Sequence, residues 1–170
     1  MDEPTAWLHQ ARADRQAAES FLKSDEGSGR CHAIATWQQT VEKAVKALVS
    51  ALHDARILGA GIRPRHEVER YVDALIRLPR AAGNRTIQQL LHGLLDQKTR
   101  PGIKALDVLA PQLPARGNTE YPFLDAKGQW TYPAAEGVFS KDEVAQFREL
   151  AYRVLDGAGR IVSAIRRRPS

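Results

Sequence analysis

Hydrophobic residues recur at three- and four-residue steps along much of the chain, and the clearest run lies between Cys31 and His53. Side chains at these steps stack on one face of an α-helix. The residues that share this face are Ile34, Trp37, Val41, Ala44, Val45, Leu48 and Leu52. The pattern therefore predicts one long helix over residues 31–53, with its apolar stripe buried against other helices.

The same periodicity predicts further helices on both sides of this segment. A first helix is expected from a Thr5 cap to about Leu22, and a third helix is expected over about 65–79. A short helix over about 86–95 follows, because Thr86 and Gln89 have the spacing of a capping box. Pro101 opens a modest helical turn that ends before residue 111.

A last amphipathic helix is predicted from a Ser140 cap to about Ile165. Glu143 stands three residues after Ser140, which completes a second capping-box pattern. Gly157 and Gly159 weaken this helix by about 1 kcal/mol each relative to alanine, and they allow close packing.

No stretch alternates at period two for long enough to predict a strand, and residues 111–139 read as irregular. We therefore expect an all-α fold, an antiparallel bundle of four long helices with one or two short ones. The 170 residues predict a single domain over 1–170, with its core over about 6–165 and a basic tail over 166–170.

The composition narrows the class of protein. No apolar run reaches the roughly 18 residues of a membrane span, and the N-terminal segment lacks the order of a signal peptide. The single cysteine, Cys31, excludes an internal disulfide and fits a reducing compartment. We expect a cytoplasmic protein without membrane contact. No histidine or cysteine pattern has metal-ligand spacing, so no metal or cofactor is expected.

The formal charge of +5 is unevenly distributed. Residues 56–80 hold six arginines against three acids, and residues 160–170 hold four arginines and no acid. Clustered arginine can hold the phosphates of a nucleic acid, and it can also form a solvated face or a frayed tail. The residues that would contact nucleic acid are Arg63, Arg65, His66, Arg70, Arg166, Arg167 and Arg168.

The helix over 31–53 resembles the second helix of HEPN domains. That family commonly shows paired glutamines and then an E-K-A-x-K-A-L run, and the matching positions here are Gln38, Gln39, Glu42, Lys43, Ala44, Lys46, Ala47 and Leu48. Residues 65–68, RHEV, stand where the family often has T-H-D-L, and Tyr121-Pro122 stands where it often has R-Y-P. The likeness covers roughly residues 6–165.

The resemblance implies a helical bundle, usually a homodimer, that acts in RNA metabolism, toxin–antitoxin pairs or phage defence. Many members are metal-independent endoribonucleases that use an arginine followed, after four to six residues, by a histidine. In such a pair the arginine stabilises the phosphate and the histidine moves a proton. Other members lack the motif and serve as non-catalytic partners, often of small nucleotidyltransferases.

Two segments approach the catalytic pattern. Arg85 and His92 have six residues between them, and positions seven apart share a helix face, so the two side chains could act together. The alternative interpretation is purely structural: an arginine at a helix start and a partly buried histidine would give the same sequence. Arg116 is followed after four residues by Tyr121, where the family has histidine. Tyrosine is a poor base at neutral pH, so this loop reads as structural or partner-facing.

Two functions follow from these observations. The first is a HEPN-like module that binds RNA or a protein partner without cleaving RNA. The second is a HEPN endoribonuclease that uses Arg85 with His92, or a site centred on Arg116. A plain scaffolding bundle without nucleic acid is a third and weaker hypothesis.

Overall fold

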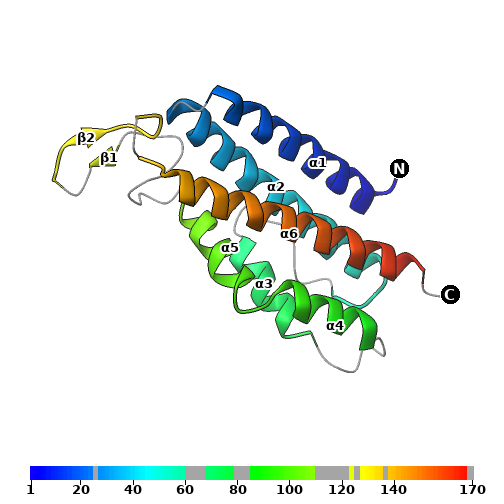
Figure 1. The fold of residues 1–170 in the computed structure, drawn as a ribbon. Helices are drawn as coiled ribbons and strands as arrows, with labels where there is room; N and C mark the ends of the chain where they lie inside the picture. The colour runs from blue at the N-terminus through cyan, green and yellow to red at the C-terminus, as the bar shows by residue number, and fades with distance from the viewer. Residues whose placement is uncertain are drawn as a thin grey trace.

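The computed structural model describes residues 1–24, 27–59, 68–78, 85–109, 123–124, 127–135 and 138–167. These ranges are predominantly helical, and a two-stranded antiparallel hairpin is the other regular element (Figure 1). In chain order the elements are α1 (Glu3–Phe21), η1 (Leu22–Ser24), α2 (Gly27–Asp54), α3 (Val68–Ile76), α4 (Arg85–Leu94), α5 (Thr99–Val108), β1 (Phe123–Leu124), β2 (Trp130–Thr131) and α6 (Lys141–Arg166).

Three long helices, α1, α2 and α6, pack against one another (Figure 1). Two ion pairs fix the direction of α6 against α1. Arg148 near the start of α6 meets Glu19 near the end of α1 at 2.7 Å, and Arg166 at the end of α6 pairs with Asp2. Helices α1 and α6 therefore run antiparallel, and α2 runs in the same direction as α6.

Helix α2 supplies the centre of the core, as its periodicity predicts. Its apolar stripe is almost inaccessible to solvent: Trp37, Leu48 and Leu52 are 0 % exposed, and Val45 is 1 % exposed. Burying side chains of this size contributes roughly 1.5–3 kcal/mol each. The helix begins at Gly27, four residues before the predicted start. Cys31 is buried in this helix.

The shorter helices α3, α4 and α5 form a second group beside α6 and α2 (Figure 1). Two glycines bring this group close to its neighbours. A β-carbon placed on Gly157 of α6 would lie 2.5 Å from Cδ1 of Leu94 in α4. A β-carbon placed on Gly102 of α5 would lie 3.1 Å from both Leu150 methyl carbons. The predicted packing role of Gly157 is confirmed.

The helix starts test the capping predictions. Ser140 accepts a hydrogen bond from the Glu143 amide and Glu143 bonds back to the Ser140 amide, so the capping box of α6 is confirmed. The Thr5 cap is wrong, because Asp2 is the N-cap and accepts from the Thr5 amide at 3.0 Å. A hydrogen bond from the Thr5 hydroxyl, together with this backbone bond, lowers the pKa of Asp2. Thr86 lies within α4 and does not cap it.

The bundle differs from the expected four long helices. The predicted third helix is described over the nine residues of α3, so the described ranges hold three long helices and three of nine or ten residues. The hairpin was not predicted, because strands of two residues are too short to show alternation along the sequence. It projects beyond the ends of the long helices (Figure 1). The HEPN arrangement itself stays a prediction.

Candidate functional site

Helix α4 carries both members of the first candidate pair. Arg85 is its first residue and His92 lies near its end, and both side chains are exposed. The seven-residue separation places them on one face, about 10 Å apart along the helix axis. Neither side chain makes a hydrogen bond or an ion pair with the residues that the structure describes. His92 is thus more accessible than the partly buried histidine of the alternative interpretation.

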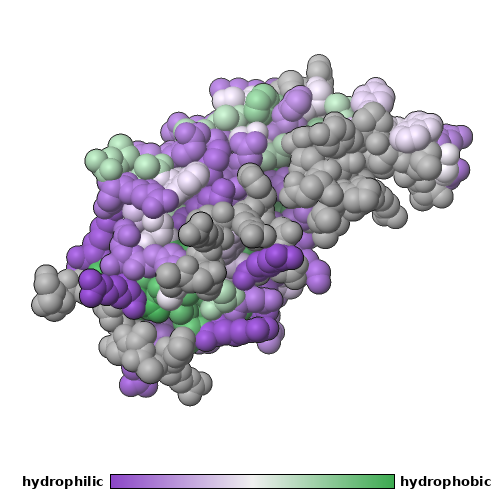
Figure 2. All heavy atoms as spheres, turned by 180° about the vertical axis from the view of Figure 1, so that it is seen from behind, coloured by the Kyte–Doolittle hydropathy of each residue, from purple (hydrophilic) through white to green (hydrophobic). Residues whose placement is uncertain are grey.

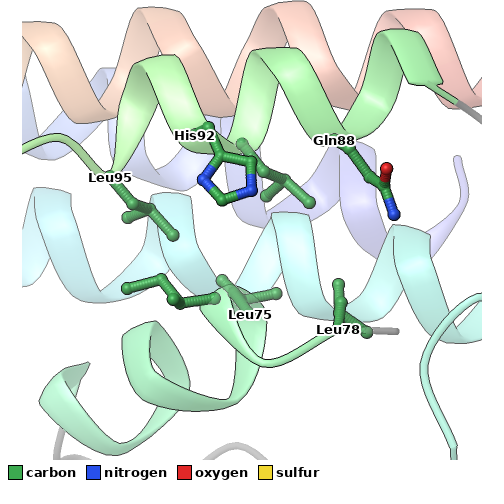
Figure 3. A pocket seen from close by; sticks show the side chains of 7 residues that line it. Leu75, Leu78, Gln88, His92 and Leu95 are labelled. Carbon is green, nitrogen blue, oxygen red and sulfur yellow. The ribbon is translucent and has the colours of Figure 1, made fainter. Parts of the chain in front are cut away.

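A small apolar pocket lies beside His92, between α3 and α4 (Figure 3). Its volume is about 160 Å³, and its walls are Leu75, Ile76, Leu78, Gln88, Leu91, His92 and Leu95. His92 and Gln88 point from α4 toward the pocket, with Leu75 and Leu78 facing them from the α3 side (Figure 3). Apolar surface is visible over this part of the molecule (Figure 2). The pocket therefore has an aliphatic floor and two polar groups at its edge.

A larger groove continues from this pocket along α5. It encloses about 650 Å³, and its lining is Val72, Asp73, His92, Leu95, Asp96, Gln97, Arg100, Pro101, Ile103 and Lys104. His92 and Leu95 line both hollows, so they mark the place where the two join. Helices α3, α4 and α5 therefore share one continuous depression with His92 at its middle.

Both carboxylates in this groove are already engaged. Asp73 accepts a hydrogen bond from Arg100 at 3.0 Å. Asp96 accepts the amides of Thr99 at 2.7 Å and Lys98 at 3.0 Å, which are free donors at the start of α5. The bond from the Thr99 amide is the main reason why the pKa of Asp96 is lowered. Asp73 is therefore held by an ion pair, whereas Asp96 keeps its negative charge and is stabilised by backbone amides.

Two exposed arginines lie close in sequence to residues that line the pocket. Arg77 directly follows α3, and Arg85 begins α4 one turn before Gln88. Neither guanidinium is paired with the described residues, and Lys104 lines the groove from α5. The groove lining itself holds two acids, Asp73 and Asp96, and two cations, Arg100 and Lys104, and Arg77 and Arg85 are additional cations close by in the sequence.

The other predicted site residues lie elsewhere in the chain, away from the Arg85 and His92 pair on α4 or outside the described residues. Arg166 at the end of α6 pairs with Asp2 and donates to Thr5, and Arg167 is exposed beside it. Arg70 is exposed on α3. The remaining candidates lie outside the described residues; they are Arg63, Arg65, His66, Arg116, Tyr121 and Arg168. Of the four catalytic candidates, Arg85 and His92 are the two that lie among the described residues.

Sequence reasoning missed Gln88 and the leucines that shape the pocket. The sequence did point to these leucines, because Leu75 on α3 and Leu91 on α4 belong to the apolar faces predicted for the two helices. Periodicity does not show that a pocket remains between α3 and α4 at this point.

Comparison with family models, with curated proteins and with solved structures found no match to this chain. Among the described residues, no group of three histidine, cysteine, aspartate or glutamate side chains is placed to hold a metal ion. No described helix is long and apolar enough to cross a membrane.

Proposed function

We propose that this chain is a HEPN-like helical module that binds RNA at the face made by α3, α4 and α5, and that it does not cleave the RNA. One observation carries the proposal. Arg77 and Arg85 are exposed and unpaired among the described residues, and they lie close in sequence to Ile76 and Gln88, which line the pocket. Unpaired guanidinium groups of this kind attract phosphates.

The lining of the depression offers both apolar and polar contacts to a nucleotide. Arginine binds a phosphate through two parallel N–H donors, so Arg85 and Arg77 would hold the backbone. The groove has apolar walls at Leu95 and Ile103, and Gln97 also lines it. A base can lie in such a groove while its phosphate remains at the rim.

Binding is favoured over cleavage by the setting of His92. A histidine that serves as a general base is usually oriented by a hydrogen bond to its second ring nitrogen. Among the described residues, no carboxylate or carbonyl makes such a bond to His92. The imidazole instead extends over the aliphatic pocket (Figure 3), where it can contact RNA without being held for proton transfer.

The resemblance extends the proposal to partners. A HEPN-like module would form a homodimer, and it would pair with a nucleotidyltransferase-type protein within a toxin–antitoxin or phage-defence system in the cytoplasm. These parts of the proposal rest on the E-K-A-x-K-A-L run of α2 and on the order of the other segments. They are tested by size-exclusion chromatography and by pull-down with candidate partners.

The alternative is a metal-independent endoribonuclease with Arg85 and His92 as its catalytic pair. The observation in its favour is that the two side chains are exposed on one face of α4. Bound RNA or a second protomer would then have to supply the orientation that the described residues do not give to His92.

One assay separates the two functions. The purified protein is incubated with a labelled pool of tRNA and mRNA in the presence of a chelator, and both retention and cleavage are measured. We expect retention with intact RNA. Cleavage that His92→Ala abolishes, and that the exposed α1 control His9→Ala preserves, would contradict the proposal and establish the endoribonuclease.

A further inference from the structure

An ion pair joins α3 and α5 in the wall of the larger groove. Asp73 on α3 accepts a hydrogen bond from Nη2 of Arg100 on α5 at 3.0 Å, although 27 positions separate the two residues in the chain. Both side chains line the groove and are about half exposed, at 47 % for Asp73 and 48 % for Arg100. An anion that enters the groove can therefore reach the Arg100 guanidinium.

This pair uses a small part of what the Arg100 guanidinium can donate. A guanidinium has five N–H donors in a planar fork, and among the described residues Arg100 makes one side-chain hydrogen bond, to Oδ1 of Asp73. Arg166, by contrast, donates to both carboxylate oxygens of Asp2. Exposed ion pairs contribute little to folding stability, because water screens both charges. A phosphate that offers two oxygens to the fork can therefore replace Asp73 without unfolding α3 or α5.

The position of Arg100 does not favour the stability of α5. Arg100 is the second residue of this helix, at the end where the backbone dipole carries partial positive charge and disfavours cations. Asp96 already accepts the backbone amides of Lys98 and Thr99 at this end. Lys104 follows Arg100 one turn later on the same face and also lines the groove. Helix α5 thus turns two cations toward the groove, which is typical of a wall that binds a polyanion.

We infer that Asp73 occupies the place of an RNA phosphate on Arg100, and that RNA bound in the groove exchanges with this carboxylate. In the unbound protein Asp73 neutralises Arg100. When RNA binds, a phosphate accepts the Arg100 donors and Asp73 turns to solvent. Asp73 therefore lowers the affinity of the groove for RNA, whereas Arg100 raises it. This inference rests on the proposed RNA-binding function and adds a phosphate contact on α5 to that of Arg85 on α4.

The test measures the affinity of the full chain for a labelled single-stranded RNA by fluorescence anisotropy. Asp73→Asn removes the charge, keeps the shape, and should tighten binding by about two- to fivefold, the scale of one exposed ion pair. Arg100→Ala should weaken binding and flatten the slope of log K against log salt by about 0.7. In the Arg100→Ala background, Asp73→Asn should give no gain, because the carboxylate then has no phosphate contact to oppose.

Glu19→Gln is the matched control. Glu19 pairs with Arg148 at 2.7 Å between α1 and α6, and Arg148 is 50 % exposed, but neither residue lines the pocket or the groove. The substitution therefore removes the carboxylate from an arginine of similar exposure elsewhere on the protein, and it should leave RNA affinity unchanged. Circular dichroism checks that each variant is folded.

The outcomes distinguish this inference from the proposed function. Wild-type protein that binds no RNA at any salt concentration defeats the proposed function, and the exchange with it. Wild-type binding that Asp73→Asn weakens or leaves unchanged defeats the exchange alone. A gain of the same size in the Arg100→Ala background, or with Glu19→Gln, would also overturn it, since the effect would then come from overall charge and not from Arg100.

Discussion

Gly157 lets α4 lie directly against α6. The nearest atom to a β-carbon at this position is Cδ1 of Leu94 at 2.5 Å, and Leu94 is itself buried. Gly159, two residues later, has only an Arg12 nitrogen at 4.0 Å. The two glycines therefore have opposite roles, although the sequence presents them alike.

Alanine substitutions separate these roles. Gly159→Ala should raise the free energy of unfolding by about 0.5–1 kcal/mol, because alanine is the better helix former and the space is open. Gly157→Ala should lower it by about 1 kcal/mol, because Leu94 has to move within a packed core. Urea denaturation measures both. Equal stabilisation by the two substitutions would show that α4 does not pack on α6 as described.

Asp96 contributes stability through the start of α5, and this contribution depends on pH. Its pKa is lowered in the folded state, so the stabilisation is present above the ordinary value of 3.8 and is lost as the pH falls through the folded pKa. Asp96→Ala should cost about 1 kcal/mol at pH 7, as for other capping residues. The gap from the wild type should close as the pH drops below 3.8.

Denaturant titrations at pH 7 and at successive values below 4 follow this gap. Asp156→Ala on α6 is the control, because Asp156 is exposed and makes no hydrogen bond or ion pair with the described residues. It should differ little from the wild type throughout. A gap for Asp96→Ala that stays constant with pH would refute the proposed role of the Thr99 amide.

At the scale of elements, α2 forms the centre of the buried core. Val45 lies on its buried stripe and is 1 % exposed, whereas Gln39 on the same helix is exposed. Val45→Asp should cost about 4 kcal/mol or more, because it buries a charge without a partner. Gln39→Asp should change stability by less than about 0.5 kcal/mol. Thermal unfolding followed by circular dichroism compares the two, and similar melting temperatures would contradict the central position of α2.

The elements also show what sequence periodicity can predict. The apolar stripe of α2 and the Ser140 capping box of α6 are local patterns, and both are confirmed. The first turn of α1 shows the limit, because Asp2 and Thr5 are both good caps and the choice depends on a few backbone angles. The hairpin was not predicted, because its pairing depends on contacts between residues 123–124 and 130–131 and not on a repeating pattern.

At the scale of the whole molecule, the candidate site needed the tertiary arrangement. The spacing of Arg85 and His92 was visible in the sequence. The depression was not visible in the sequence, because residues of three helices, α3, α4 and α5, line it. Packing of these helices brings Asp73 to Arg100, although the two residues are 27 positions apart in the chain. The sequence likewise does not show that Asp96 accepts the amides at the start of α5.

The central claim is that RNA binds to the face of α3, α4 and α5 through its arginines. The most direct measurement is the affinity for a single-stranded RNA as a function of salt, with Arg85→Ala compared with Arg12→Ala. Arg12 is exposed on α1, its guanidinium lies beside Gly159 of α6, and it is not among the residues that line the depression. We predict that Arg85→Ala weakens binding and flattens the slope of log K against log salt by about 0.7, the value for one lost phosphate contact. Arg12→Ala should leave both unchanged. Equal effects of the two substitutions, or RNA binding that does not respond to salt, would contradict the account.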